Sequence, residues 1–267
     1  MYREFKRLAV GGVVNNLNTK LVQGVTVAIP PLAEQEHIVA ELDLLQGIID
    51  KQKVQLKELD TLAQSLFYDM FGDPVENDKG WDSLPIGQIG KVITGNTPST
   101  KDENNYSSDD YCFVKPSDIE REGVCNIAIT EYHISAKAFE NARQLPVGSV
   151  LTTCIGIIGK VGVLKIDATC NQQINAVIPD TKRVSSSFLA FCILGLRSIL
   201  ESMANAPVVP IINKGDFSRI AIPLPPLPLQ QSFATKIEAI ERQKASINAS
   251  IAETQKLFDY TMDKYFG

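Results

Sequence analysis

The sequence has few of the residues on which metal sites and disulfide frameworks depend. Its 267 residues include 2 histidines, His37 and His133, and 5 cysteines, none of which forms a Cys-x-x-Cys pair. A structural zinc site needs several thiolate or imidazole ligands at close spacing, and a disulfide framework needs paired cysteines. We therefore expect no metal site, and cysteines that are reduced and mostly buried.

Catalytic motifs are also absent. The sequence contains no Gly-x-Ser-x-Gly or His-Glu-x-x-His stretch and no Asn/Asp-Pro-Pro-aromatic methyltransferase loop. The run from Gly156 to Lys160 is not a phosphate-binding loop, because Cys154 stands where that motif needs its first glycine and Val161 replaces its hydroxyl residue. We expect a chain with no catalytic residue and no cofactor. An enzyme is the third-ranked hypothesis, and it rests only on Cys154 near Gly156 and Lys160.

Long apolar runs and an excess of positive charge are missing as well. The runs at 147–163 and 188–200 are interrupted by Gly, Lys, Thr or Arg and lack the roughly 20 clean apolar residues of a membrane helix. Residues 1–7 are not followed by the apolar stretch of a signal peptide. These features predict a cytoplasmic protein without a membrane partner. The net charge of −5 argues against an indiscriminate polyanion binder, but a sequence-specific DNA reader needs only a small basic face.

What the sequence does contain is an internal repeat. Residues 8–72 recur without a gap as residues 203–267, and the shift of 195 carries Pro30-Pro31-Leu32, Gln35 and Phe71-Gly72 onto identical residues. Each copy reads as a short tail, a Pro-Pro pair and a long helix. Because a repeat of this kind determines the architecture, we expect two similar arms around the intervening segment.

The first arm carries a heptad seam. Residues alternate at steps of four and three, nine of the ten seam positions are apolar, and charged residues occupy the faces between them. Pro30-Pro31 marks the start of the helix, and Gly72 with Pro74 marks its end. The seam positions are Ile38, Leu42, Leu45, Ile49, Gln52, Leu56, Leu59, Ala63, Leu66 and Met70.

The second arm repeats this seam in register, with Lys244, Thr254 and Thr261 as polar interruptions. An arm of about 37 residues is roughly 55 Å long, and the simplest packing of the two is an antiparallel helical hairpin. Two alternatives stay open: the helices are ordinary core of one globular domain, or they assemble a homodimeric bundle. The second seam reads Phe233, Ile237, Ile240, Lys244, Ile247, Ile251, Thr254, Phe258, Thr261 and Tyr265.

Between the arms the sequence predicts an α+β fold, that is, one mixed α/β domain carried on a coiled-coil hairpin of two long antiparallel helices. Short β-branched segments bounded by Gly, Pro, Asn or Asp predict strands. Residues 186–204 predict a helix, and residues 95–110 and 156–159 predict loops. The predicted strands are at 127–129, 149–153, 162–166 and 174–178.

The loops of this domain are rich in side chains that can read DNA. Asn and Gln can pair with adenine in a bidentate manner, and Lys can contact guanine or phosphate. The same residue types are common in plain turns, and Asn171 and Gln172 in particular have the alternative of bonding only to backbone. The candidate DNA contacts are Thr97, Ser99, Lys101, Lys115, Lys160, Asn171, Gln172, Lys182 and Arg183.

Taken in their order, several stretches resemble the specificity subunit of Type I restriction-modification systems. Each motif is short, but with the helix repeat they cover nearly the whole chain. They are residues 13–18 with their echo at 208–213, the helix entries at 29–35 and 224–230, the helix exit at 70–74 with Trp81 and Leu84, the domain opening at 94–99, and the segments 115–119, 159–162 and 171–175.

This resemblance implies target-recognition domains that each read half of a split double-stranded DNA site, joined by two antiparallel helices. The helices would dock adenine methyltransferase subunits, and these partners would bind S-adenosylmethionine and flip the target base. A motor-nuclease subunit would join them for cleavage. The seam residues assigned to docking are Leu42, Leu45, Ile49, Leu56, Leu59, Ile237, Ile240, Ile247, Ile251 and Phe258.

The resemblance also divides the chain and shows one departure from the family. The expected parts are a tail remnant of a preceding recognition domain (1–28), a first long helix (29–72), a target-recognition domain (73–222) and a second long helix (223–267). Since one recognition domain stands where the family has two, we expect a half-subunit that pairs with itself, a recombination cassette or a gene fragment. The alternative function is a coiled-coil scaffold without DNA binding, and salt-dependent retention on duplex DNA separates the two.

Overall fold

A computed structural model describes residues 19–24, 29–204 and 209–266. Apart from the short helix α2 (Thr19–Gln23), the predicted tail remnant at 1–28 lies outside the described residues, and so does the motif at 13–18. The chain divides into two compact units, one formed by residues 1–59 with 241–267 and the other by residues 60–240. Each unit is described by itself.

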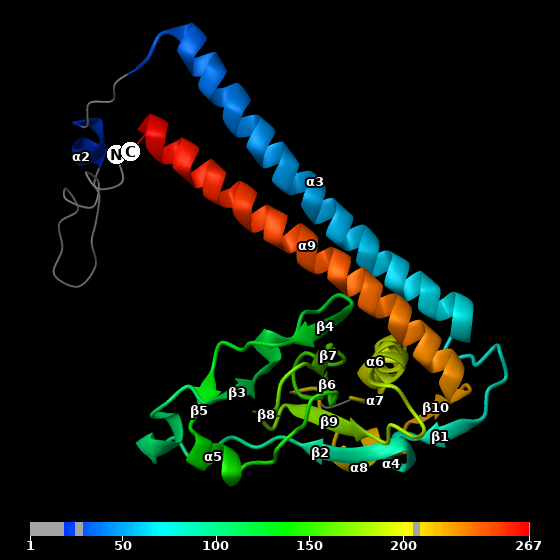
Figure 1. Cartoon of the computed structure of the whole chain (residues 1–267). Helices are drawn as coiled ribbons and strands as arrows, with labels where there is room; N and C mark the ends of the chain where they lie inside the picture. Colours follow the sequence, from blue (N-terminus) through cyan, green and yellow to red (C-terminus); the bar gives the residue numbers. More distant parts are fainter. Residues whose placement is uncertain (1–18, 25–28, 205–208, 267) are drawn as a thin grey trace. The chain divides into compact units, whose positions relative to one another are not determined.

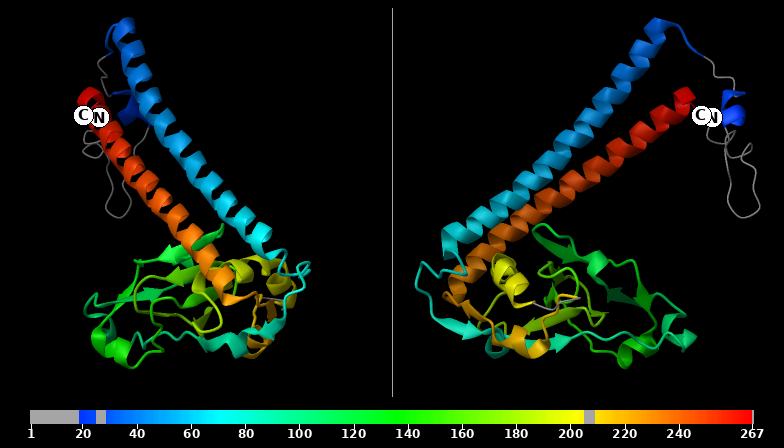
Figure 2. Two further views of the ribbon diagram at one scale, coloured as in Figure 1. Left: turned by 45° about the vertical axis from the view of Figure 1, so that its right-hand side comes forward. Right: turned by 180° about the vertical axis from the view of Figure 1, so that it is seen from behind.

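Two long helices match the two predicted arms. Helix α3 (Leu32–Phe71) and helix α9 (Leu227–Phe266) have 40 residues each, or about 60 Å at 1.5 Å per residue. Figures 1 and 2 show them side by side and running in opposite directions. In the first unit the Gln52 amide donates to the Ser250 hydroxyl at 2.7 Å, and the Tyr265 hydroxyl donates to the Glu41 carboxylate at 2.9 Å. These pairs confirm the antiparallel arrangement, because the residue number falls along one helix as it rises along the other.

The predicted seams are the inner faces of these helices. All twenty seam positions are buried or half-buried, whereas the apolar residues Val39, Leu44 and Val54 outside the seam are exposed. Lys244 is held in the seam by an ion pair with Glu241 at 3.2 Å. Packing of the apolar stripe, which removes its surface from water, thus accounts for the pairing.

Near its C-terminal end, helix α3 departs from a strict seven-residue repeat. Phe67 and Phe71, which the seam prediction missed, are each 3% exposed, while the seam residues Leu66 and Met70 are only half-buried. An α-helix with 3.6 residues per turn drifts relative to a 3.5-residue pattern, so the buried face moves onto neighbouring positions. Phe71 meets Phe188 at a ring-centroid distance of 4.8 Å.

Phe188 belongs to α6 (Ser186–Gly195), which is buried along nearly its whole length. The single helix predicted over 186–204 is wrong in one respect, since the segment bends by 59° between α6 and α7 (Arg197–Met203). A Cβ on Gly195 would lie 2.6 Å from Cγ of Pro74, so the helix end passes too close to the chain for a larger residue. Among the described residues no single helix is long and apolar enough to cross a membrane, although this bent pair together has that length and composition.

The main sheet has five strands in the order β2-β9-β6-β7-β4. Neighbours are antiparallel except β4 and β7, which are parallel. The strands are β2 (Gly90–Thr94), β9 (Ile174–Pro179), β6 (Val150–Thr153), β7 (Val161–Leu164) and β4 (Val124–Ile127). They confirm the predicted strands at 149–153, 162–166 and 174–178, but the strand predicted at 127–129 is wrong. Pairing with β7 ends at Ile127, and Ile129 is 83% exposed.

Two smaller sheets complete the domain. The three-stranded sheet has the order β5-β3-β8, with β3 parallel to β8 and antiparallel to β5, and a two-stranded sheet pairs β1 with β10. The remaining elements are β1 (Ser83–Pro85), β3 (Tyr111–Val114), β5 (His133–Ile134), β8 (Ala168–Cys170), β10 (Ala221–Pro223), α4 (Ile86–Ile89), α5 (Ala136–Glu140), α8 (Lys214–Arg219) and the 3-10 helices η1 (Glu103–Tyr106) and η2 (Pro116–Asp118).

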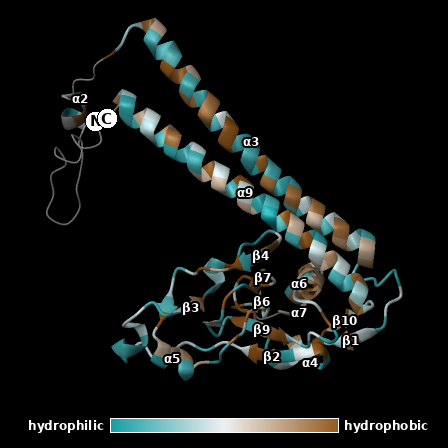
Figure 3. Cartoon of the chain, in the orientation of Figure 1, coloured by the Kyte–Doolittle hydropathy of each residue, from teal (hydrophilic) through white to brown (hydrophobic). Residues whose placement is uncertain are grey.

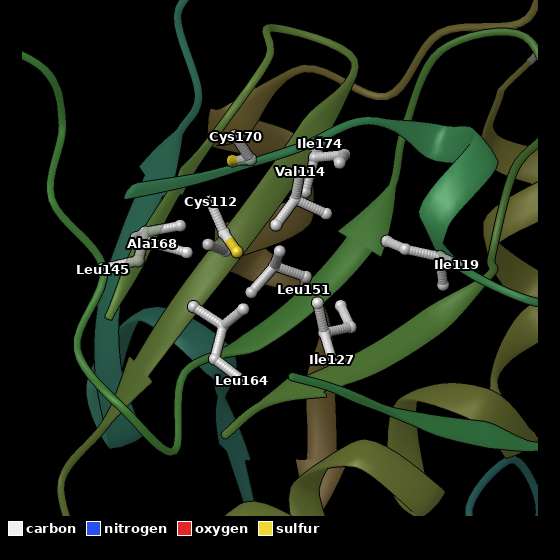
Figure 4. Packing of buried hydrophobic residues seen from close by; sticks show 11 residues of the cluster. Cys112, Val114, Ile119, Ile127, Leu145, Leu151, Leu164, Ala168, Cys170 and Ile174 are labelled. Carbon is white, nitrogen blue, oxygen red and sulfur yellow. The ribbon is translucent and has the colours of Figure 1, made fainter. Parts of the chain in front are cut away.

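One apolar core joins the three-stranded and five-stranded sheets. Val114 and Cys170 of the smaller sheet converge with Leu151 and Leu164 of the larger one, and all four are fully buried (Figure 4). Hydrophobic residues also predominate in β2, β6, β9 and α6, whereas hydrophilic residues are interspersed along α3 and α9 (Figure 3). The shared core fixes the ends of β3 and β8 relative to the larger sheet, and this determines which loops meet.

Candidate nucleic-acid interface

The candidate site begins where the parallel strands β3 and β8 end. Val114 pairs with Cys170, so the next residues, Lys115 and Asn171, follow at the same edge of the sheet. The Asn171 N–H donates to the Val114 carbonyl at 3.1 Å and continues the pairing beyond the strands. Parallel strands place their carboxyl ends together. Two predicted contact residues, 56 positions apart in the sequence, thereby become neighbours.

The loop that follows β2 joins the same edge. Gly95 donates to the Ile174 carbonyl at 3.0 Å, and Asn96 donates to the Cys170 carbonyl at 2.9 Å. A Cβ on Gly95 would lie 2.2 Å from the Asn171 carbonyl oxygen, so only glycine allows this approach. Loop 95–110 therefore leaves β2 directly beside the end of β8.

This approach brings together two further predicted residues. The Thr97 hydroxyl donates to Oε1 of Gln172 at 2.6 Å, and both side chains are exposed. The pair fixes the Gln172 carboxamide oxygen and leaves its amide nitrogen without a partner among the described residues. At this exposed edge the amide can donate to adenine N7 while the second lone pair of Oε1 accepts from the N6 amino group, which is the bidentate contact by which Gln recognises adenine.

The rest of loop 95–110 is held by its own side chains. The Tyr106 hydroxyl donates to the Pro98 carbonyl at 2.8 Å, and the Asn105 amide donates to the Ser99 carbonyl at 3.0 Å. The Ser99 hydroxyl accepts from the Lys101 backbone N–H at 3.3 Å, so it serves the turn. The Lys101 ammonium is exposed and makes no ion pair with any described residue.

Lys115 is positioned by an aromatic ring. Its Nζ lies 3.0 Å from the centroid of Tyr132, a cation–π contact that holds the ammonium. The Lys115 N–H donates to the Asp118 carboxylate at 2.7 Å, which closes the turn at η2. Lys160 reaches the same turn, because its Nζ donates to the Pro116 carbonyl at 2.8 Å. Lys115 and Lys160 thus share one turn beside the Thr97 loop.

Asn171 faces inward at this edge. It is 7% exposed, its Oδ1 accepts from the Gln173 N–H at 3.0 Å, and its Nδ2 donates to Oε1 of Gln173 at 2.9 Å. The whole carboxamide is therefore used within the turn before β9, and it bonds to the Gln173 side chain as well as to backbone. A base contact by Asn171 stays a prediction.

Lys182 and Arg183 do not join the other candidates. They follow the end of β9, whereas Asn171 and Gln172 precede its start, and six strand residues separate these ends by about 20 Å. The Arg183 guanidinium donates to the Gln88 carbonyl at 3.1 Å, so it is already used within the domain.

One residue of this edge was missed by sequence reasoning. The Arg143 guanidinium donates to the Thr94 carbonyl at 2.6 Å, and the Arg143 N–H donates to Oδ1 of Asn96 at 3.2 Å. Arg143 thereby supports the first residues of loop 95–110 from the segment before β6. In the sequence, Arg143 is one basic residue in an irregular segment, and such residues are too common to predict a role for this one.

Cys154, the thiol on which the enzyme hypothesis rests, is buried in the domain. Burial raises the pKa of the Cys154 thiol to about 12, and its Sγ lies 3.4 Å from the Thr152 carbonyl. A thiol protonated at neutral pH is a poor nucleophile, which argues against the enzyme hypothesis. Within the described residues no group of three or more His, Cys, Asp or Glu side chains could hold a metal ion.

The family match and the similar known proteins all indicate the same family. Residues 78–255 match the family described as Type I restriction modification DNA specificity domain. The chain is 26% identical over 165 residues to the Type I restriction enzyme HindI specificity subunit of Haemophilus influenzae, and 30% identical over 173 residues to the MjaIX specificity subunit of Methanocaldococcus jannaschii. These matches cover 61% and 62% of the chain but only 36% and 40% of the relatives. The chain therefore matches well under half the length of these two relatives.

Solved structures show the same fold. The HsdS subunit from Thermoanaerobacter tengcongensis aligns with a TM-score of 0.53 at 21% identity, covering 99% of this chain and 67% of that one. The S subunit of a Type I restriction-modification system from M. genitalium aligns with a TM-score of 0.63 at 11% identity, covering 98% and 68%. Both alignments support the mixed α/β domain and the two long helices.

Proposed function

This chain belongs to the Type I restriction modification DNA specificity domain family, and on that premise we propose that its recognition domain, residues 73–222, reads one half of a bipartite DNA site. The observation that carries the proposal is the family match over residues 78–255, which includes every loop of the candidate interface. Both relatives are specificity subunits by name, which supports a role in recognition and not in catalysis.

The edge formed by β2, β3 and β8 is the surface we propose for reading bases. Thr97 fixes the Gln172 carboxamide, whose free amide donors suit the acceptors of a base edge. Lys115, held by Tyr132, and Lys160 supply positive charge beside it for guanine or phosphate. The residues fulfil different tasks, because base contacts specify the sequence and phosphate contacts set the register.

The helix pair is the part we propose for docking adenine methyltransferase subunits. The seam side chains, Leu45 and Ile49 among them, pack inside the pair, so their role in docking is to hold the two helices in register. Exposed apolar side chains of α3 remain for a partner to cover; they are Val39, Leu44, Ile48 and Val54. Catalysis, S-adenosylmethionine and base flipping belong to the methyltransferase partner in this proposal.

We place the protein in the cytoplasm, where a motor-nuclease subunit would complete the assembly. We propose that two copies of this chain pair as a homodimer, so that two recognition domains at 73–222 read a whole site. Two-fold symmetry then requires the two half-sites to be inverted copies of one sequence. A methylated site with unrelated halves would exclude the homodimer.

Coexpression with the methyltransferase subunit of the same system tests the proposal. The complex is purified through a tag on this chain, and N6-methyladenine is mapped in the host DNA. The proposal predicts a stable complex and one methylated bipartite motif. Failure of the two proteins to associate, or methylation of no motif, would overturn it. Salt-dependent binding of a duplex by the complex separates this function from a scaffold without DNA binding.

A further inference from the structure

A polar groove lies along β2, the edge strand of the five-stranded sheet. It encloses about 690 Å³. One wall consists of residues 91–94 of β2, and the other includes Glu140 and residues 142–144, while Lys214 at the start of α8 completes the lining. The groove is thus built from three separate elements of the recognition domain.

Positive charge predominates in this groove. Its lining holds Lys91, Arg143 and Lys214 against one carboxylate, Glu140. The ammonium groups of Lys91 and Lys214 make no hydrogen bond or ion pair with any residue in the described ranges. Since the whole chain has a net charge of −5, this local excess of cations is not a consequence of composition. Cations collected in a concave surface attract anions more strongly than the same charges on a flat one.

The groove continues directly into the candidate interface. Its wall ends at Thr94, and the next residue, Gly95, opens the loop that carries Thr97. Arg143 belongs to both surfaces, because it lines the groove and donates to the Thr94 carbonyl and to Oδ1 of Asn96. A long ligand such as DNA that contacts Thr97 and extends past Gly95 therefore also contacts the groove.

We propose that this groove binds the sugar-phosphate backbone of the DNA that flanks the recognised bases. The inference rests on the proposed function and adds a second contact surface to it. From Lys91 to Thr94 the strand runs about 10 Å, a length over which the backbone of one DNA strand presents more than one phosphate. Lysines act as point charges toward phosphate, so the groove contributes affinity and register to every sequence alike.

A salt titration of DNA binding tests the proposal. The full chain is titrated with a fluorescent random-sequence duplex between about 50 and 200 mM salt, where each phosphate contact adds about 0.9 to the slope of log affinity against log salt. The test variant is Lys91→Gln with Lys214→Gln. Arg143 is left in place because its guanidinium supports the recognition loop. The matched control is Lys165→Gln with Lys236→Gln, which removes two exposed lysines outside the groove.

The test variant should reduce the salt slope by about 1.8, since two contacts are lost, so that over this range its affinity falls about 12-fold less than that of the wild type. The control should keep the wild-type slope. An unchanged slope in the test variant, or an equal loss in the control, would overturn the groove as a backbone site. So would protection of Lys91 and Lys214 from acetylation by inorganic phosphate but not by duplex.

Failure of the groove proposal is separable from failure of the proposed function. If the coexpressed complex methylates a motif and the test variant keeps the wild-type salt slope, the function stands and the groove is excluded. If the wild-type chain alone binds no duplex even at the lowest salt, the groove proposal fails, whereas the proposed function is still decided by whether the coexpressed complex methylates a motif. Methylation of the same motif at a lower rate by the test variant would support it, because phosphate contacts carry no sequence information.

Discussion

Gly95 is the residue on which the assembly of the candidate interface depends most directly. A Cβ at this position would lie 2.2 Å from the Asn171 carbonyl oxygen and 2.3 Å from the Cys170 carbonyl oxygen. Both obstacles are backbone atoms, so a rotamer change cannot relieve the contact. Replacement by alanine must push loop 95–110 away from the end of β8.

The cost of Gly95→Ala follows from the bonds that the displaced loop would break. The hydrogen bonds from Gly95 to Ile174 and from Asn96 to Cys170 contribute about 1 kcal/mol each. Residual crowding adds about 1–2 kcal/mol if the displacement is incomplete. We therefore expect the free energy of unfolding of the recognition domain to fall by about 2–4 kcal/mol.

Urea unfolding followed by Trp81 fluorescence measures this change. Trp81 is the only tryptophan of the chain, and its indole N–H donates to the Phe71 carbonyl at 2.9 Å, within the same unit as Gly95. The matched control is Gly215→Ala, whose Cβ would meet side-chain tips and no backbone atom, namely Asn213 Oδ1 at 3.2 Å and Arg219 Nη1 at 4.0 Å. The control should change stability by less than about 1 kcal/mol, because alanine favours a helix. A Gly95→Ala variant as stable as the control would refute the close approach of the loop and β8.

The remaining predictions concern three single side chains. Tyr132→Leu should weaken duplex binding about 2- to 30-fold, because it releases Lys115 from the aromatic ring. The control Tyr132→Phe keeps the ring and should bind as the wild type does. Equal binding by both variants would exclude the cation–π support. Cys154 should resist alkylation of the native protein at neutral pH while the half-buried Cys125 reacts, as mass spectrometry can determine, because burial raises the pKa of Cys154 to about 12. Since the folded state holds that thiol proton more tightly than the unfolded state does, stability should fall as pH rises from about 9 toward 12, and a rise would contradict the burial. Gln52→Leu removes the Gln52 Oε1, which is buried without a partner among the described residues, together with the hydrogen bond from its amide to Ser250. Since the unpaired oxygen costs about 1–3 kcal/mol and the hydrogen bond contributes about 1 kcal/mol, the free energy of unfolding of the helix pair should rise by about 0–2 kcal/mol in thermal denaturation followed by circular dichroism, and a loss of stability would contradict this interpretation.

The helix pair could be predicted from sequence because its information is local and periodic. Every seam position follows from a repeating step of four and three, and all twenty are buried or half-buried. The same reasoning failed at Phe67 and Phe71, where drift of the helix moves the buried face off the repeat. It also missed the bend between α6 and α7, which lies beside Pro74, a residue distant in the sequence.

The candidate interface could be predicted only as a set of loop residues. Thr97, Lys115 and Gln172 were named because of their chemistry, but their assembly depends on parallel pairing of β3 with β8 and on a glycine between two carbonyls. Neither feature has a local pattern. For the same reason Lys182 and Arg183 could not be separated from the rest, although β9 places them at its opposite end.

The role of the edge in reading DNA is tested most directly by the methylated motif itself. The chain is coexpressed with its methyltransferase subunit as wild type, as Gln172→Ala and as the exposed-lysine control Lys165→Gln. Loss of the Gln172 donors should relax the motif at about one base pair of a half-site, since a bidentate contact discriminates against the wrong base by about 1–3 kcal/mol. The control should keep the wild-type motif. An identical motif and methylation rate for Gln172→Ala and the wild type would contradict the assignment of this edge as the surface that reads bases.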